Sequence, residues 1–304
     1  MDLSTVTLFV KQVLATFITL IISVFPFAGN NSVDTFSAKD PDDLIMSFSA
    51  VSDIHVETNN PDSYKAFTGI LKGLQAGDNT DAVVFLGDNV MNGQLLESFF
   101  FYSALKGINP AEKNIVVAGN HDFGNGAGDY EALRKNYINN NKTYLGNHID
   151  NAYFYEVING CYMICLVSED PTTQSFIMSS EQFDWLENVL IEAGNKNAPV
   201  FIFNHFPLRY LNGDKNADDL AELLNKYNVL LYIHGHIHNN LGTDNFYTWG
   251  GVSCINLPRS TEIVDYEPGD GIVVELYNDT VLVRGRDFIN GNWIEDLEFN
   301  YQMA

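Results

Sequence analysis

The stretch "IVVAGNHDFG", Ile115 to Gly124, decides the fold that we expect for this chain. It begins as an uninterrupted apolar run and ends abruptly in Gly-Asn-His-Asp. In an open α/β sheet, binding groups gather beyond the carboxyl ends of buried strands. We therefore interpret this stretch as a buried strand that delivers an amide (Asn120), an imidazole (His121) and a carboxylate (Asp122) to one edge of a sheet.

Four further stretches share this design, since each is an apolar run that ends in residue types that bind metals. They are "VSDIH" with Asp53 and His55, "FLGDN" with Asp88, "FNHFP" with His205, and "IHGHIH" with His236 and His238. A single Gly-Asp is usually a turn, but packing does not require five polar clusters at strand ends. Oxygen and nitrogen ligands without thiolate suit a site for Mn, Fe or Zn of the catalytic kind better than a structural zinc site. Together the five stretches predict a metal site.

Strand-like and helix-like segments alternate from Leu44 onward, which favours a parallel α/β sheet at the start of the domain. Strands are expected at 44–53, 81–88 and 114–122, with helices at 63–75 and 95–108 between them. Asn159-Gly160 then joins two strands as a type I′ hairpin, and Ser179 or Ser180 caps a helix that runs to Gly194. Buried strands follow at 198–205 and 228–236, and a last hairpin turns at residues 278–279. No repeat or boundary interrupts residues 44–304, so one two-sheet α/β domain is the simplest account.

The composition is that of a globular protein with a strongly acidic surface. Of 304 residues, 46% are hydrophobic and 18% charged, and 16 basic against 39 acidic residues give a net charge of −23. Such a surface repels the phosphate backbone, so we expect no binding of long nucleic acids. An anionic substrate would need a local positive centre, which metal ions can supply. Three cysteines do not form a disulfide framework, and we expect them to be packed core thiols.

The first 28 residues differ from the rest. The uncharged run from Val13 to Phe25 has the length of a signal-peptide core and is shorter than the about 20 residues of a membrane span. We expect residues 1–28 to be a signal-peptide-like or anchor segment of an exported protein, either secreted or tethered to a membrane. An amphipathic helix docked on the domain is the alternative, and a cytoplasmic location is the less favoured one. Residues 29–43 are polar and turn-rich and form a linker to the domain at 44–304.

The order of the polar stretches resembles that of the calcineurin-like metallophosphoesterases. The resemblance is carried by Asp53-x-His55, Gly87-Asp88, Gly119-Asn120-His121-Asp122, His205 and Gly235-His236-x-His238, and it covers about 44–258. The stretch "SSEQFDWLENVL" is similar to a helix common in the branch that contains class III cyclic-nucleotide phosphodiesterases. The resemblance implies two mixed β-sheets packed as a sandwich and flanked by helices.

The resemblance also implies two metal ions of the Mn, Fe or Zn type. Asp53, His55 and His238 would hold the first ion, Asn120, His205 and His236 the second, and Asp88 would bridge them. A hydroxide that bridges the metals would attack phosphorus in line. His121 would assist the leaving group, and Asp122 would either fix the tautomer of His121 or cap a helix.

Four further residues lie near these motifs. His148 in the second Gly-Asn-His follows the Asn-rich, loop-like "YINNNKTY" and is expected on the surface or rim. His234 is expected to pack against the site at a strand end. Arg209 either steadies a phosphate or is an exposed salt-bridge partner. Met91 stands where purple acid phosphatases have a tyrosine, which disfavours a tyrosinate–iron enzyme.

The leading functional hypothesis is the metal-dependent hydrolysis of a small phosphorylated substrate, either a phosphomonoester or a small phosphodiester. The alternative from another class is a catalytically silent binding scaffold on the same fold. Among enzymes the alternative is a nuclease, which the acidic balance and the lack of a basic stripe disfavour. The sequence does not choose the substrate, the metals or the oligomeric state.

Overall fold

The structure, a computed structural model, describes residues 40–77, 80–261 and 268–302. All of them belong to one compact unit, Asp34–Ala304. The predicted export or anchor segment at 1–28 lies outside the described residues, as does most of the predicted linker at 29–43. Within the described ranges, no helix is long and apolar enough to cross a membrane.

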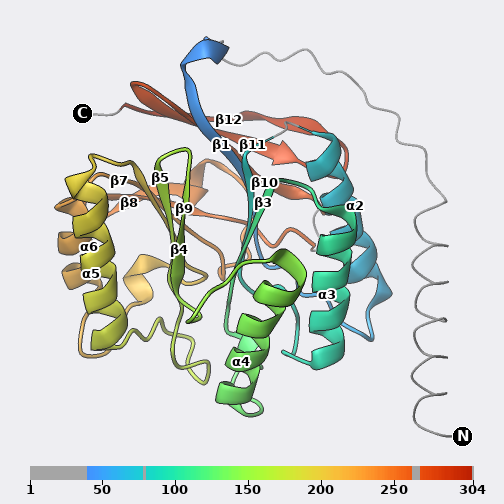
Figure 1. Ribbon diagram of the computed structural model, residues 1–304. Helices are drawn as coiled ribbons and strands as arrows, with labels where there is room; N and C mark the ends of the chain where they lie inside the picture. The colour runs from blue at the N-terminus through green and yellow to red at the C-terminus, as the bar shows by residue number, and fades with distance from the viewer. Residues whose placement is uncertain (1–39, 78–79, 262–267, 303–304) are drawn as a thin grey trace, which may run out of the picture. The chain divides into compact units, whose positions relative to one another are not determined.

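The strands form two six-stranded sheets (Figure 1). The first sheet has the order β12-β11-β10-β1-β2-β3, with β1 at Leu44–Val51, β2 at Ala82–Leu86, β3 at Lys113–Val117, β10 at Asp270–Tyr277, β11 at Thr280–Asp287 and β12 at Asn292–Gln302. The second has the order β4-β5-β6-β7-β9-β8, with β4 at Phe154–Ile158, β5 at Cys161–Cys165, β6 at Val200–Phe203, β7 at Val229–His234, β8 at Phe246–Trp249 and β9 at Val252–Asn256. Each sheet combines parallel pairs, such as β1–β2 and β6–β7, with antiparallel pairs, such as β1–β10 and β4–β5.

The helices cover the outer faces of the two sheets (Figure 1). Their bounds are Pro61–Ala76 for α2, Leu95–Ile108 for α3, Tyr130–Asn140 for α4, Ser180–Asn195 for α5 and Ala217–Asn225 for α6. On the first sheet, Phe67 of α2 and Phe101 of α3 both pack on Phe85 of β2. Helices α5 and α6 share a separate hydrophobic cluster with β5, β6 and β7 of the second sheet.

The inner faces of the sheets pack on each other. Phe48 of β1 makes edge-to-face contacts with Phe201 and Phe203 of β6, with ring centroids 5.1 and 5.5 Å apart. In β5, Cys161, Met163 and Cys165 point into this inner core, while the residues between them face α5 and α6. The predicted sandwich of two mixed sheets flanked by helices is therefore confirmed.

Most predicted elements in the first half of the chain match the structure. Helix α3 has the predicted bounds, and Ser179 rather than Ser180 caps α5 by accepting a hydrogen bond from Gln182 N. The Asn159-Gly160 turn has positive φ at both residues (49° and 81°), as a type I′ turn requires. All three cysteines are free and buried, as expected.

The prediction that "YINNNKTY" is a loop is wrong. Its first residues belong to α4, and residues 141–145 continue as one turn of π-helix. Tyr137 is buried and donates a hydrogen bond to Val116 O of β3, and the buried Asn141 side chain donates to the Tyr102 hydroxyl of α3. These tertiary bonds outweigh the weak helix propensity of asparagine. Helices α4 and α6 and strands β8, β9 and β12 were not predicted from the sequence.

Candidate metal centre

The seven predicted ligands all follow the carboxyl ends of parallel strands. Strands β1, β2 and β3 are neighbours in the first sheet, and β6 and β7 are neighbours in the second. The loops after these strands bond to one another across the sandwich. His236 N, after β7, donates to Asp53 Oδ2, after β1, at 3.1 Å. The edge of the two-sheet sandwich thus gathers polar groups from both sheets at one place.

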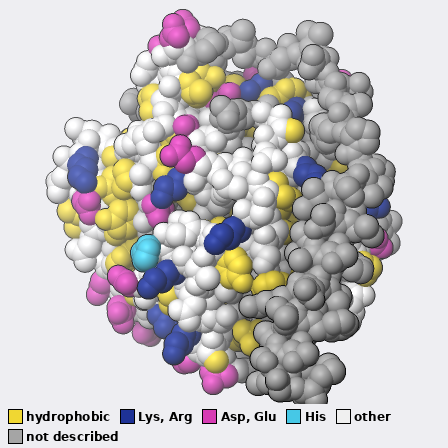
Figure 2. Space-filling model, turned by 45° about the vertical axis from the view of Figure 1, so that its right-hand side comes forward, with side chains coloured by type: hydrophobic (Ala, Val, Ile, Leu, Met, Phe, Trp, Pro, Cys, Tyr) yellow, Lys and Arg dark blue, Asp and Glu magenta, His cyan; other side chains and the backbone are white. Residues whose placement is uncertain are grey.

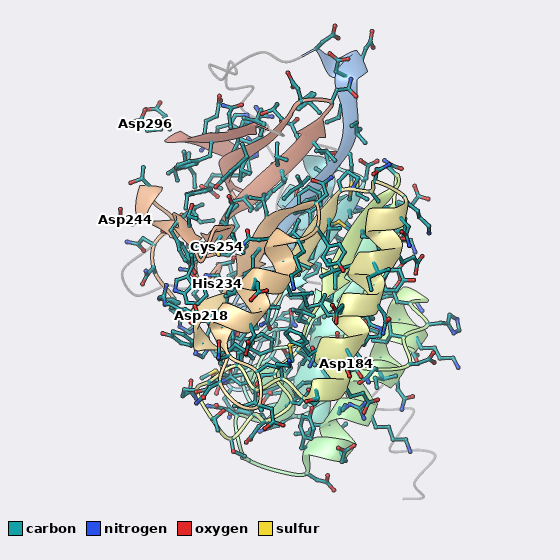
Figure 3. All side chains as sticks on the ribbon, turned by 90° about the vertical axis from the view of Figure 1, so that its left-hand side faces the viewer. Asp184, Asp218, His234, Asp244, Cys254 and Asp296 are labelled. Carbon is teal, nitrogen blue, oxygen red and sulfur yellow. The ribbon has the colours of Figure 1, made fainter. Side chains whose placement is uncertain are left out.

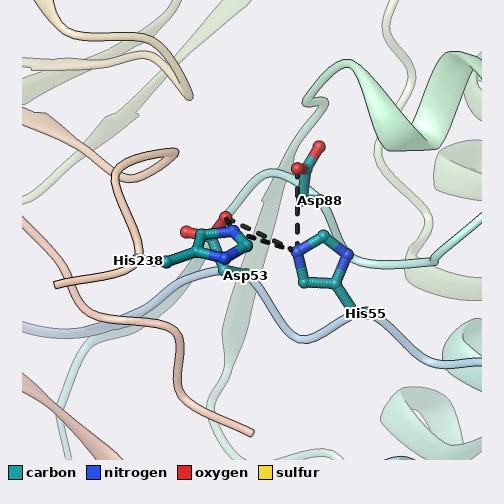
Figure 4. Close-up of side chains that lie close together, drawn as sticks. All are labelled: Asp53, His55, Asp88 and His238. Carbon is teal, nitrogen blue, oxygen red and sulfur yellow. Dashed lines mark hydrogen bonds and ion pairs between the residues drawn. The ribbon is translucent and has the colours of Figure 1, made fainter. Parts of the chain in front are cut away.

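The first group of converging side chains is Asp53, His55, Asp88 and His238 (Figure 4). One potential ligand atom from each lies within 4.8 Å of all the others. His238 Nε2 is 2.9 Å from Asp53 Oδ1 and 3.3 Å from His55 Nε2. His55 Nε2 also lies 3.8 Å from Asp88 Oδ2. This spacing fits a single cation between the four side chains.

The second group is Asp88, His205 and His236, whose ligand atoms also lie within 4.8 Å of one another. His205 Nε2 is 3.1 Å from Asp88 Oδ2. On the other side of the ring, His205 Nδ1 lies 3.0 Å from Leu86 O. Since a carbonyl only accepts, Nδ1 carries the proton and Nε2 is free to bind a cation. Asp88 belongs to both groups, as a bridging carboxylate would.

The site places two buried carboxylates, Asp53 and Asp88, among several histidines. The carboxylates of Asp53 and Asp88 are fully buried. Burial alone would raise the pKa of Asp88, but the interactions with His205 and His55 together outweigh it and lower that pKa to about 2. For His205, burial lowers the pKa while Asp88 and Asp53 raise it, to about 9 in balance. The groups therefore require positive charge, which a proton on His205 supplies in the absence of a stronger cation.

Asn120 offers a further oxygen. Its amide nitrogen donates to Asn125 Oδ1 at 3.0 Å, whereas its own Oδ1 is buried and has no hydrogen-bond partner among the described residues. A buried amide oxygen without a partner costs free energy, about 1–3 kcal/mol. Coordination of a cation would remove that cost.

Backbone strain marks the site more sharply than sequence pattern does. Five of the predicted ligands have the left-handed backbone that non-glycine residues rarely adopt: Asp53 (φ 52°), His55 (47°), Asp88 (51°), His236 (72°) and His238 (57°). Each such residue costs on the order of 1–3 kcal/mol, and such strain clusters at functional sites. The strained backbone at these residues lowers the stability of the fold and points their side chains toward one another.

Two glycines allow the loops to approach the carboxylates. A Cβ on Gly119 would lie 2.2 Å from Asp88 Oδ1, and a Cβ on Gly235 would lie 2.5 Å from Asp53 Oδ2. Any larger residue would displace the carboxylates. This explains in physical terms why glycine precedes Asn120 and His236.

His121 lies beside the first group with 20% of its side chain exposed. Its ring packs edge-on against His55 at 4.8 Å, and Nε2 lies 4.0 Å from Asp88 Oδ2. Nδ1 is 2.6 Å from Met91 O, so Nδ1 is the donor and keeps its proton. Nε2 is the nitrogen that faces the site.

The prediction that Asp122 fixes the tautomer of His121 is wrong, and so is the alternative that it caps a helix. The Asp122 carboxylate accepts hydrogen bonds from Gly119 N at 2.8 Å, Asn89 N at 3.1 Å and Val90 N at 3.3 Å. It ties the loop after β3 to the loop after β2. The Met91 carbonyl, which accepts a hydrogen bond from His121 Nδ1, fixes the tautomer of His121, and Asp129 caps α4. The sequence carried no signal for Asn89 beyond its position next to Asp88.

The three remaining candidates, His148, His234 and Arg209, lie in different surroundings. His148 is exposed, as expected. His234 is fully buried at the end of β7, where Nε2 lies 2.7 Å from the Tyr247 hydroxyl, so it packs behind the site as expected. The interpretation of Arg209 as a salt-bridge partner is wrong, because no described carboxylate pairs with it; its neighbours are Tyr210 and Tyr247.

Comparisons with known proteins agree with this geometry. The calcineurin-like phosphoesterase family profile matches residues 46–240. A dimetal phosphatase from Danio rerio has a similar structure (TM-score 0.59, 16% identity), with 86% of this chain and 100% of that chain covered. A purple acid phosphatase from yellow lupin is similar at TM-score 0.59 and 14% identity, over 84% of this chain and 53% of that one. No curated protein sequence matches.

The match to the family profile, together with the carboxylates and histidines gathered at the strand ends, supports a metal-dependent hydrolase of phosphate esters. The chain belongs to the calcineurin-like phosphoesterase family. Family membership and the two ligand groups that share Asp88 indicate a dinuclear metal centre. The likeness to the class III cyclic-nucleotide phosphodiesterase branch stays a prediction.

Proposed function

We propose that this enzyme hydrolyses a small phosphomonoester or phosphodiester at a pair of transition metal ions, with His121 assisting departure of the leaving group. The observation that carries the proposal is the sharing of Asp88 by two compact ligand groups. Two divalent ions repel each other strongly at about 3.5–4 Å, and a shared carboxylate offsets this repulsion. The bound metals would supply Lewis-acid stabilisation of the phosphoryl oxygens and would activate water as the nucleophile.

The residues present fit such a pair. Asp53, His55 and His238 with Asp88 suit one ion, and Asn120, His205 and His236 with Asp88 suit the other. Only Asp53 and Asp88 contribute formal negative charge, against four positive charges of two divalent ions. The neutral Asn120 amide preserves the surplus, which attracts a phosphate ester despite the net charge of −23.

His121 would act on the leaving oxygen through Nε2. The bond from Nδ1 to Met91 O holds the ring with Nε2 toward Asp88, and an imidazolium there can donate a proton. General acid catalysis of this kind contributes about 10²–10⁴-fold in rate. Asp122 would support the reaction only by fixing the loops that carry Asp88 and Asn120.

A small substrate is favoured over a long nucleic acid. In the face shown in Figure 2, basic side chains are scattered among acidic and uncharged ones and form no continuous stripe. Together with the acidic balance of the chain, this distribution disfavours binding along the phosphodiester backbone of a nucleic acid. We therefore keep a nuclease activity as the less favoured alternative.

The test is metal analysis followed by a substrate panel. Purified full-length protein should carry about two transition metal ions per chain and should hydrolyse 4-nitrophenyl phosphate or bis(4-nitrophenyl) phosphate after loading with Mn²⁺, Fe²⁺ or Zn²⁺. The absence of both bound metal and activity with all three ions would favour the silent scaffold. Hydrolysis of single-stranded DNA at a rate equal to that of the small esters would favour the nuclease.

From the sequence of residues 1–28 we also propose that the enzyme is exported, either cleaved or tethered to a membrane. N-terminal sequencing of the protein from separated cytoplasmic, membrane and extracellular fractions tests this. An intact N-terminus found only in the cytoplasm would contradict it.

A further inference from the structure

Arg209 is a cation that has no anionic partner among the described residues of this strongly acidic protein. It lies in the short 3₁₀-helix Leu208–Tyr210, which follows His205, and its side chain is exposed. Its guanidinium carbon lies 5.5 Å from the Tyr210 ring centroid and 5.6 Å from that of Tyr247. No described carboxylate forms an ion pair with it, although the chain has 39 acidic residues. The two rings hold the guanidinium by cation–π contacts and leave its N–H groups available.

Tyr210 connects Arg209 to the second ligand group, and Tyr247 connects it to the strand end behind that group. The Tyr210 ring lies 5.9 Å from the ring of His236, a predicted ligand. Tyr247 of β8 bonds through its hydroxyl to His234, at the end of β7. Figure 3 labels His234 on the side of the molecule that carries β7 to β9. A single tyrosine ring thus separates the guanidinium from the second ligand group.

The surroundings of Arg209 preserve its positive charge. Burial raises the pKa of Tyr247 well above its usual range, so the phenol stays neutral and cannot neutralise the guanidinium. Arginine presents a rigid fork that binds phosphate and carboxylate in a bidentate manner. In a chain of net charge −23, a positive group near the candidate metal centre that no described carboxylate pairs with is suited to an anionic ligand.

We propose that Arg209 binds a second anionic group of the substrate, a phosphate or a carboxylate remote from the phosphorus that is hydrolysed. The substrate class is then a phosphoester that carries two anionic groups, one at the metals and one at Arg209. This inference rests on the proposed function only in assuming that a phosphoryl group binds at the metal centre.

Binding of non-hydrolysable ligands tests the proposal without relying on turnover. The Mn²⁺-loaded full-length protein is titrated by calorimetry with alkylphosphonates, α,ω-bisphosphonates and ω-phosphonocarboxylates with spacers of two to eight methylenes. At the best spacer length, a second anionic group should tighten binding by about tenfold or more, as expected for hydrogen bonds to a charged group. A larger gain from the second phosphonate identifies phosphate as the natural group, and a larger gain from the carboxylate identifies carboxylate.

The variant Arg209→Gln should lose this gain while its affinity for the alkylphosphonates stays within about threefold of the wild type. The matched control is Lys226→Gln, which removes the same charge. Lys226 pairs with Glu222 and lies ahead of β7, at the end of that strand opposite the site, so this variant should keep the gain.

The proposal is overturned if no bifunctional ligand binds better than the alkylphosphonate of equal length. It is also overturned if the gain persists in Arg209→Gln or disappears in Lys226→Gln. If the gain depends on Arg209 but the loaded enzyme hydrolyses no ester, the hydrolytic function fails while the anion subsite stands.

Discussion

The replacement of His121 by alanine is the sharpest test of how the site works. Nδ1 donates to Met91 O at 2.6 Å, so Nε2, which lies 4.0 Å from Asp88 Oδ2, is the nitrogen that can exchange a proton with substrate. If Nε2 protonates the leaving oxygen, its loss costs about 10²–10⁴-fold in rate, or about 3–5 kcal/mol of transition-state stabilisation.

The size of the effect should depend on the leaving group. The assay compares kcat of Mn²⁺-loaded wild type and His121→Ala on 4-nitrophenyl phosphate, phenyl phosphate and an alkyl phosphate. A nitrophenolate leaves with little help, so the loss there should be about tenfold, rising to about 10³-fold for the alkyl ester. Metal content should be unchanged, because His121 belongs to neither ligand group.

The chain contains its own control for this experiment. Gly146-Asn147-His148 repeats the local sequence of the motif, but His148 is exposed, so His148→Ala should leave every rate unchanged. An equal loss on all three esters would show that His121 acts by charge or position rather than by proton transfer. Unchanged turnover would remove His121 from the mechanism altogether.

Three further predictions concern the framework of the site. Gly235→Ala should lower the metal content below two ions per chain, because its Cβ would lie 2.0 Å from Ser52 Oγ and 2.5 Å from Asp53 Oδ2. The control is Gly107→Ala, where a Cβ meets nothing within 4 Å, and it should leave the metal content unchanged. Equal metal contents in the two variants would refute the steric argument. Asp122→Ala should lower the free energy of unfolding in urea by about 3–5 kcal/mol, because it leaves buried N–H donors without acceptors; a loss as small as that of the exposed control Asp150→Ala would contradict this. Burial lowers the pKa of His234 to about 3, below the unfolded value of about 6.5, so its contribution to stability is present above pH 6.5 and is lost as the pH falls toward 3. Between pH 6.5 and 5 the metal-free protein should lose about 2 kcal/mol from this group, and His234→Gln should lose correspondingly less; identical slopes of stability against pH would show that His234 is not the cause.

Much of the fold could be read from local pattern. Helix α3 has the bounds that its sequence predicted, and the Asn-Gly pair at 159–160 specifies its turn, because both depend on neighbours in sequence. Helix α4 was partly misread because its last turn is held by buried Tyr137 and Asn141, whose partners lie in β3 and α3 or within α4 itself. Local propensity carries no information about such partners.

The sequence by itself identified the candidate metal ligands, since a carboxylate or imidazole that ends a buried strand has few structural uses. Only the tertiary structure decided that Asp88 serves both ligand groups, that Met91 rather than Asp122 orients His121, and that Arg209 rests on tyrosines instead of a carboxylate. The physical reason is that these relations form between loops of different strands. Their geometry follows from how two sheets pack and from left-handed backbone at the ligands, neither of which leaves a periodic trace in the chain.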